Sequence, residues 1–200
     1  MEREALLTGS VQPGDRPPAP GRLALVQAFV NTVDREHGPD LLDDPDDLTA
    51  WLTKRGLSPP PPPRGPGLHV RVTPDGLRDA REVREALRDV LLANGSGEPA
   101  SEAFAILDAA AARARLRPWF EGGVLLAEAD GLDAALGTIL SAAFRARADG
   151  TFDRLKACPR DVCGWAFYDR SPTGSARWCS MRVCGGRTKA RAYYRRRSSR

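Results

Sequence analysis

The chain has 200 residues, and its hydrophobic content of 42% is enough to build a core, which excludes a wholly disordered protein. The net charge of +4 is unevenly distributed: residues 1–150 carry 17 basic and 23 acidic side chains, whereas residues 151–200 carry 13 and 3. The basic C-terminal part indicates a polyanionic partner, and no stretch approaches the roughly 18 apolar residues of a membrane span.

The first half of the chain is predicted to be mainly helical. Residues 1–21 are expected to form a flexible lead-in, after which apolar side chains recur at helical spacing over residues 22–36. A second helix is predicted from Asp44, a favourable cap that a proline follows, to Gly56. Residues 58–67 then form a proline-rich loop, either an extended spacer or a ligand for a proline-reading domain.

Four more elements complete a helical domain that we place at residues 22–149. The clearest amphipathic helix begins after a Thr73 cap and is expected to stop at Gly95. Another helix is predicted over residues 100–112. Alternating side chains on both sides of Gly122-Gly123 favour a β-hairpin, and the pattern then returns to a helix.

This domain carries no recognisable catalytic motif. It has no glycine-rich phosphate loop, no H-E-x-x-H motif and no Ser, His and Asp set with a familiar local signature. The two histidines, His37 and His69, are expected in a loop and an extended segment, where a solvated or hydrogen-bonded role is simplest. We therefore expect no enzymatic activity and no catalytic residue. Three aromatic residues are predicted to lie in the core: Trp51, Phe104 and Trp119.

All four cysteines lie in the last 43 residues, as two C-x4-C pairs separated by fifteen residues. This spacing can place four sulfurs around one tetrahedral ion. A disulfide framework is the alternative, but it needs an oxidising compartment, and the N-terminus lacks the regions of a secretory signal. We therefore expect a cytoplasmic protein that binds one structural zinc ion (Zn2+). The predicted zinc ligands are Cys158, Cys163, Cys179 and Cys184.

The cysteine module is predicted over residues 150–200 as knuckle, strand, knuckle and helix. The stretch WAFYD alternates and favours a strand with Trp165 and Phe167 on one face, and the helix is expected to begin at about Gly185. The fold class that follows is α+β, mainly α. A helical N-terminal domain with a β-hairpin precedes a small four-cysteine zinc finger.

The predicted C-terminal helix is strongly basic. At about 100° per residue, Arg187, Arg191 and Arg195 form one row, which suits base recognition in a major groove, and neighbouring cations would hold phosphates. A merely solvated basic tail is the alternative. The predicted DNA-binding residues are Arg177, Arg182, Arg187, Lys189, Arg191, Arg195 and Arg196.

The pattern C-x4-C-G-W-x-F-Y-D-R-S…R-W-C-S-M-x-V-C-G-x-R-x-K resembles the CGNR zinc finger at the C-terminus of bacterial proteins. The segments LALVQAFVNTVD, DLLDDPDDLTAWL and LRDAREVREALRDVLLA are similar to the ABATE domain that precedes it in that family. The resemblance implies a zinc-binding, DNA-binding transcription regulator that responds to stress, with the four cysteines as ligands. Gly186 stands where the family has Asn, so either the helix cap or a base contact differs here, whereas Arg187 is retained.

We therefore expect a regulator whose partner is double-stranded DNA. Its N-terminal domain would sense a small-molecule or protein signal, form a homodimer, or both. One alternative is a zinc-stabilised protein-interaction or RNA-binding module, and another is an enzyme with a pocket in the N-terminal domain. Because the helical domain has its own apolar faces, it is expected to keep its fold when zinc is removed.

Overall fold

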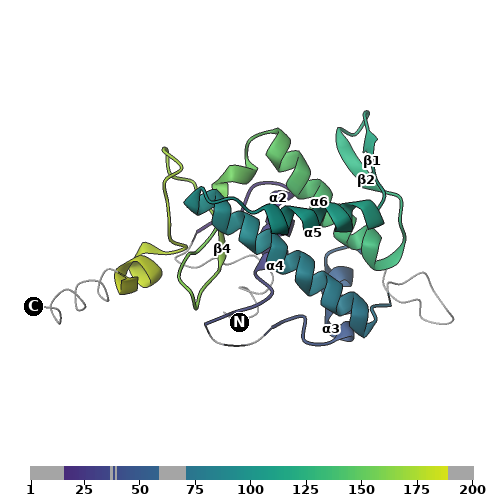
Figure 1. Cartoon of the computed structure of the whole chain (residues 1–200), viewed down its shortest axis with the longest axis horizontal. Coiled ribbons are helices and arrows are strands. Elements are labelled where there is room, and N and C mark those ends of the chain that lie inside the picture. Colours follow the sequence, from purple (N-terminus) through teal and green to yellow (C-terminus); the bar gives the residue numbers. More distant parts are fainter. Residues whose placement is uncertain (1–15, 37, 39, 59–70, 189–200) are drawn as a thin grey trace, which may run out of the picture.

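The computed structural model describes residues 16–36, 38, 40–58 and 71–188, and it confirms a mainly helical α+β chain (Figure 1). The predicted run of prolines and both histidines lie outside the described residues. Among the described residues, no helix has the length and apolarity needed to cross a membrane. The N-terminal body contains α2 (Leu23–Val30), α3 (Pro45–Lys54), α4 (Pro74–Ser96), α5 (Ser101–Arg113), β1 (Leu116–Trp119), β2 (Val124–Ala127) and α6 (Gly131–Ala148). The C-terminal module contains η1 (Phe152–Arg154), β3 (Leu155–Ala157), β4 (Ala166–Tyr168) and η2 (Met181–Gly185).

Helix α4 is the central element, and it packs against α2, α3, α5 and β3. It begins as the sequence predicts, because the Thr73 hydroxyl accepts a hydrogen bond from the Gly76 N–H at 3.1 Å. Its end lies further along than predicted: Gly95 stays helical, and the left-handed residue that ends the helix is Gly97, with φ of 79°. The shorter α3 has its predicted cap, since Asp44 accepts from the Asp47 N–H at 2.8 Å.

Helix α2 is shorter than the helix predicted over residues 22–36, because a tertiary contact overrides the helical pattern. Asn31, the first residue after α2, donates to the Ala166 carbonyl oxygen at 2.9 Å and accepts from the Ala166 N–H at 2.7 Å. Its side-chain amide thus satisfies both backbone groups of one strand residue. Two residues later, Val33 forms an isolated antiparallel bridge with Asp40, which carries the chain away from the helix axis.

The hairpin β1–β2 is confirmed, with a register that runs from Leu116 opposite Ala127 to Trp119 opposite Val124. It extends beyond the helices in Figure 1. The prediction of Trp119 as a core residue is wrong: 42% of its surface is exposed. Its ring lies against Gly122, where any side chain would clash with it. Of the other two predicted core aromatics, Trp51 is buried and Phe104 is half-buried.

Strands β3 and β4 pair antiparallel, and β4 divides two clusters of apolar side chains. Ala166 and Tyr168 belong to the main core of the helical body, as do Phe152 and Leu155 just before the first cysteine. Trp165 and Phe167 point the other way and pack with the four cysteines, which confirms the predicted face. The cysteine module therefore shares its first strands with the core of the body.

Polar side chains of the body also bind the backbone of the module. Arg88 of α4, which is fully buried, donates to the carbonyl oxygens of Gly164 and, at 2.6 Å, Val30. Asn94 of the same helix donates to the carbonyl oxygens of Phe152 and Leu155, both at 3.0 Å. Arg88 thus joins the end of α2 to the first cysteine loop, and Asn94 holds the segment that leads into β3.

Inside the module, Lys156 and Asp169 form a buried ion pair at 3.0 Å. Burial alone would raise the pKa of Asp169, but hydrogen bonds from Ser171, Lys156 and the Ala176 N–H lower this pKa to about 2. The Asp169 carboxylate thus fixes the loop that leads from β4 towards the second cysteine pair. We regard this loop as the support that positions the second half of the metal centre.

Candidate metal centre and nucleic-acid interface

The four predicted ligands meet at one buried centre. Their sulfur atoms all lie within 4.8 Å of one another. Cys179 Sγ lies 3.7 Å from Cys163 Sγ and 3.6 Å from Cys184 Sγ. Zinc–sulfur bonds of about 2.3 Å in a tetrahedron place neighbouring sulfurs about 3.8 Å apart. The donors and their spacing therefore fit one structural zinc ion, with every ligand position supplied by the protein.

The first pair of ligands lies in a tight turn directly after β3. The Cys163 N–H donates to the Arg160 carbonyl oxygen at 2.8 Å and closes the turn. Gly164 then adopts φ of 57°, and a β-carbon there would lie 3.1 Å from the Arg35 guanidinium. The left-handed backbone therefore favours glycine after the second cysteine, and any side chain there would also displace the Arg35 side chain by a few tenths of an ångström.

The second pair of ligands brackets the start of a helical segment. The Ser180 hydroxyl accepts from the Val183 N–H at 3.3 Å, so Ser180 caps the turn η2. The helical backbone begins at Met181 and continues through Thr188, the last described residue. The predicted start at Gly185 is therefore too late, because the serine cap five residues earlier was overlooked. Cys184 consequently lies within the helical turn.

The residue that departs from the family motif, Gly186, has helical dihedral angles of φ −63° and ψ −47°. It is exposed, and a β-carbon at this position would approach only the Met181 carbonyl oxygen, at 3.5 Å. Since Ser180 supplies the cap in this chain, position 186 has no capping role. The backbone here would accept Asn, and the replacement by Gly concerns the outer surface of the helix.

Four thiols this close together influence one another's ionisation. Hydrogen bonds from Cys163 and Cys179, together with nearby backbone N–H groups, lower the pKa of Cys158 to about 2. The same contacts raise the pKa of Cys179, while a hydrogen bond with Cys158 raises that of Cys163 to about 12. All four can ionise together only when a cation balances their charge. Such a donor set is suited to a divalent, thiophilic metal.

A charged pair touches this centre: Arg160 from the first cysteine loop and Glu36 from the helical body. Arg160 Nη1 lies 3.6 Å from Cys184 Sγ, so the guanidinium partly balances the thiolate charge. Glu36, in the loop after α2, accepts from the same guanidinium at 2.9 and 3.0 Å. Hydrogen bonds from Arg160 lower the pKa of Glu36, and the Glu36 carboxylate raises that of Arg160. Neither residue was predicted from the sequence; for Arg160, the available signal is its place as a basic residue inside the first C-x4-C loop.

The structure describes three of the seven predicted DNA-binding residues, and all three are exposed around the metal centre: Arg177, Arg182 and Arg187. Arg187 also forms an ion pair with the Glu36 carboxylate, which it shares with Arg160. Figure 1 places the η2 segment at one end of the molecule, away from helices α3 and α6. The other four predicted contacts lie outside the described residues: Lys189, Arg191, Arg195 and Arg196.

The metal centre leads to a first prediction. Purified protein should contain one zinc per chain, and Cys184→Ser should lower zinc affinity by more than about 100-fold, because a hydroxyl replaces a thiolate ligand. Arg160→Gln should lower it less, by roughly 10- to 100-fold, since this side chain acts on the centre from outside. Elemental analysis and competition with a metal chelator measure both. A Cys184→Ser protein that keeps wild-type zinc affinity would contradict the four-sulfur assignment.

Comparison with known families gives two matches. Residues 154–197 match the model of the CGNR zinc finger. Residues 21–150, more than half of the chain, match the model of the ABATE family, described as "Putative stress-induced transcription regulator". Comparison with curated proteins finds no match. The chain therefore belongs to the ABATE family and carries a CGNR zinc finger in its C-terminal part.

Proposed function

We propose that this protein is a transcription regulator whose zinc finger binds double-stranded DNA. The helical body would sense a signal, hold two copies together on a paired site, or both. The role is regulatory, without catalysis, and is exerted in the bacterial cytoplasm at the nucleoid. A single small module buries only about 600–1,000 Å² on DNA, which favours a paired site.

The observation that carries this proposal is the position of the basic residues relative to the metal centre. The ligand Cys184 lies in a helical turn, and Arg187 follows it within the same helical segment. No acidic residue follows Asp169 in the sequence, and residues 151–200 have a formal net charge of +10. Zinc thus fixes the start of a helical segment, and the sequence after Thr188 carries six basic residues and no acidic one, which suits a polyanionic duplex.

The contacts are expected to divide into two kinds. If the helix continues beyond Thr188, Arg187, Arg191 and Arg195 share one face and reach base edges in a major groove. Lys189, Arg196 and Arg177 hold phosphates on either side. Guanidinium groups suit bidentate recognition of guanine.

The ion pair between Glu36 and Arg187 leads to a second prediction. Before Arg187 can contact DNA, it must exchange the Glu36 carboxylate for a phosphate or a base. Glu36→Gln weakens the internal competitor and should tighten duplex binding by about fivefold at low salt, the upper range for an exposed ion pair. Titration of a labelled duplex measures the change.

The matched control is Asp161→Asn, which removes the same charge from an exposed position in the first cysteine loop. It should tighten binding less, because no cation in the described part of the chain forms an ion pair with it. Equal gains in both variants would show that only net charge matters. Weaker binding by Glu36→Gln would show that this carboxylate holds Arg160 and Arg187 in their binding geometry.

The proposal is tested by selecting bound duplexes from a random pool with the zinc-loaded protein. Enrichment of one motif, lost in the Cys184→Ser variant, is the expected result. Equal retention of all duplexes, or preferential retention of single-stranded RNA offered in competition, would overturn the proposal in favour of an RNA-binding or protein-interaction module.

A further inference from the structure

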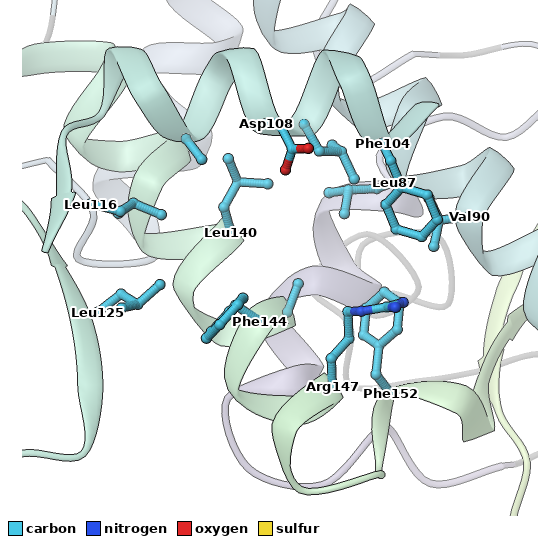
Figure 2. A pocket seen from close by; sticks show the side chains of 13 residues that line it. Leu87, Val90, Phe104, Asp108, Leu116, Leu125, Leu140, Phe144, Arg147 and Phe152 are labelled. Atoms are coloured by element: carbon cyan, nitrogen blue, oxygen red, sulfur yellow. The ribbon is translucent and has the colours of Figure 1, made fainter. Parts of the chain in front are cut away.

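The helical body contains a cavity of about 430 Å³ that the zinc finger does not use. It lies between α4, α5, α6, the β1–β2 hairpin and η1, and Figure 2 shows side chains from each of these elements pointing into it. Its volume falls within the range of small-molecule sites, roughly 300–1,000 Å³. It is the best-formed candidate for the sensing function of this body.

The wall of this cavity is almost entirely apolar. Leu87 and Val90 of α4 and Leu140 of α6 line it, and Leu116 and Leu125 of the hairpin line it on the opposite side from Val90. Phe144 lies at the opening, with 57% of its surface exposed. A wall of this composition binds an apolar group of matching size through the hydrophobic effect.

Two charged side chains lie in this wall, Asp108 from α5 and Arg147 from α6 (Figure 2). The Arg147 guanidinium lies 5.0 Å from the ring centroid of Phe104 and 5.8 Å from that of Phe152. These aromatic contacts hold the cation against the cavity. Within the described part of the chain, Arg147 forms no ion pair. A cation held in this way leaves its N–H groups available to an anion.

We infer that the cavity binds a small amphipathic carboxylic acid. Its apolar body fills the space between the leucines, and its carboxylate accepts hydrogen bonds from Arg147. Asp108, which enters from the facing helix, disfavours a second negative charge on the ligand and accepts a hydrogen bond from a hydroxyl or amino group. The ligand is thus a monoacid with a compact aromatic or aliphatic body.

The position of the cavity connects it to the zinc finger. Leu87 lines it, and the next residue, Arg88, donates to the Gly164 carbonyl in the first knuckle. Phe152 also lines it, three residues before β3 begins. A ligand here touches Phe152, which lies between the segment that matches the ABATE family, residues 21–150, and the segment that matches the CGNR zinc finger, residues 154–197. Regulation of DNA affinity by this ligand rests on the proposed function. Binding of the acid to the cavity is independent of it.

The test uses the zinc-loaded full chain and two probes with the same apolar body, 4-phenylbutyrate and the uncharged 4-phenylbutanol. Calorimetry should give one site per chain, with the acid bound about tenfold more tightly than the alcohol, as expected for one charge-assisted contact. Arg147→Gln should weaken the acid about tenfold and leave the alcohol unchanged. Arg145→Gln is the matched control, on the same helix but outside the cavity, and should change neither.

Ala111→Trp fills the cavity from α5 and should abolish binding of both probes. Equal affinity for the acid and the alcohol, or an Arg147→Gln protein that binds the acid normally, overturns the inference. So does a dimer in sedimentation that Ala111→Trp dissociates, because the cavity would then be covered by a second copy. Duplex titration is run separately: acid binding without DNA binding overturns the proposed function alone, and the reverse result overturns this inference alone.

Discussion

Removal of zinc with a chelator is expected to unfold the cysteine module and to destabilise the helical body with it. Structural zinc contributes about 10–16 kcal/mol to the folding of small modules. Here the module also supplies part of the main core, since Phe152, Leu155 and Tyr168 pack with the helices. Each buried side chain of this kind contributes roughly 1.5–3 kcal/mol. The shared core therefore favours cooperative loss of structure in the module and the body when zinc is removed. The sequence had instead predicted that the body keeps its fold without zinc.

Circular dichroism and thermal unfolding measure this effect with and without chelator. We expect a lower helical signal and a lower melting temperature for the transition of the body, both restored by added zinc. A body transition at an unchanged temperature after zinc loss would show that the helices form a core of their own.

Replacement of Arg88 by Met is expected to cost roughly 3–5 kcal/mol in the free energy of unfolding, the range for breaking a buried charged contact. The variant leaves the carbonyl oxygens of Val30 and Gly164 unsatisfied. It also removes a partner of Glu85. Burial alone would raise the pKa of Glu85, but Arg88 and Arg84 lower it to about 2.

The control is Arg78→Met, on the same helix, where the side chain is 71% exposed and pairs with an exposed Asp75. It should change stability by less than about 1 kcal/mol. Urea denaturation of the zinc-loaded proteins measures both variants. Similar losses in the two variants would contradict the view that Arg88 joins the body to the first knuckle.

Short sequence motifs correctly predicted those features that depend only on residues close together in the chain. The caps at Asp44 and Thr73 and the meeting of the four cysteines at one centre are confirmed, because turn geometry and cysteine spacing are encoded by neighbouring residues. The end of α2 could not be predicted in this way, since Asn31 leaves the helix to bind Ala166, 135 positions away.

The contact of Glu36 with the metal centre could not be predicted from the sequence for the same reason. Glu36 is an ordinary acidic residue in its local sequence, and only the folded chain brings it to Arg160 and Arg187. The cavity is another example. Phe104, Arg147 and Phe152 come from three separate elements, and each alone is unremarkable in its own segment.

The central claim is that a zinc-anchored helix binds duplex DNA with distinct base and phosphate contacts. Its most direct test is a titration of Arg187→Ala, Arg191→Ala and Lys189→Ala against a selected and a scrambled duplex at two salt concentrations. The two arginine variants should lose about 1–3 kcal/mol on the selected duplex and relax preference at one base pair each. Lys189→Ala should weaken both duplexes alike and reduce the salt slope by roughly one unit. Equal losses for all three variants on both duplexes would contradict the account and leave only an electrostatic tail.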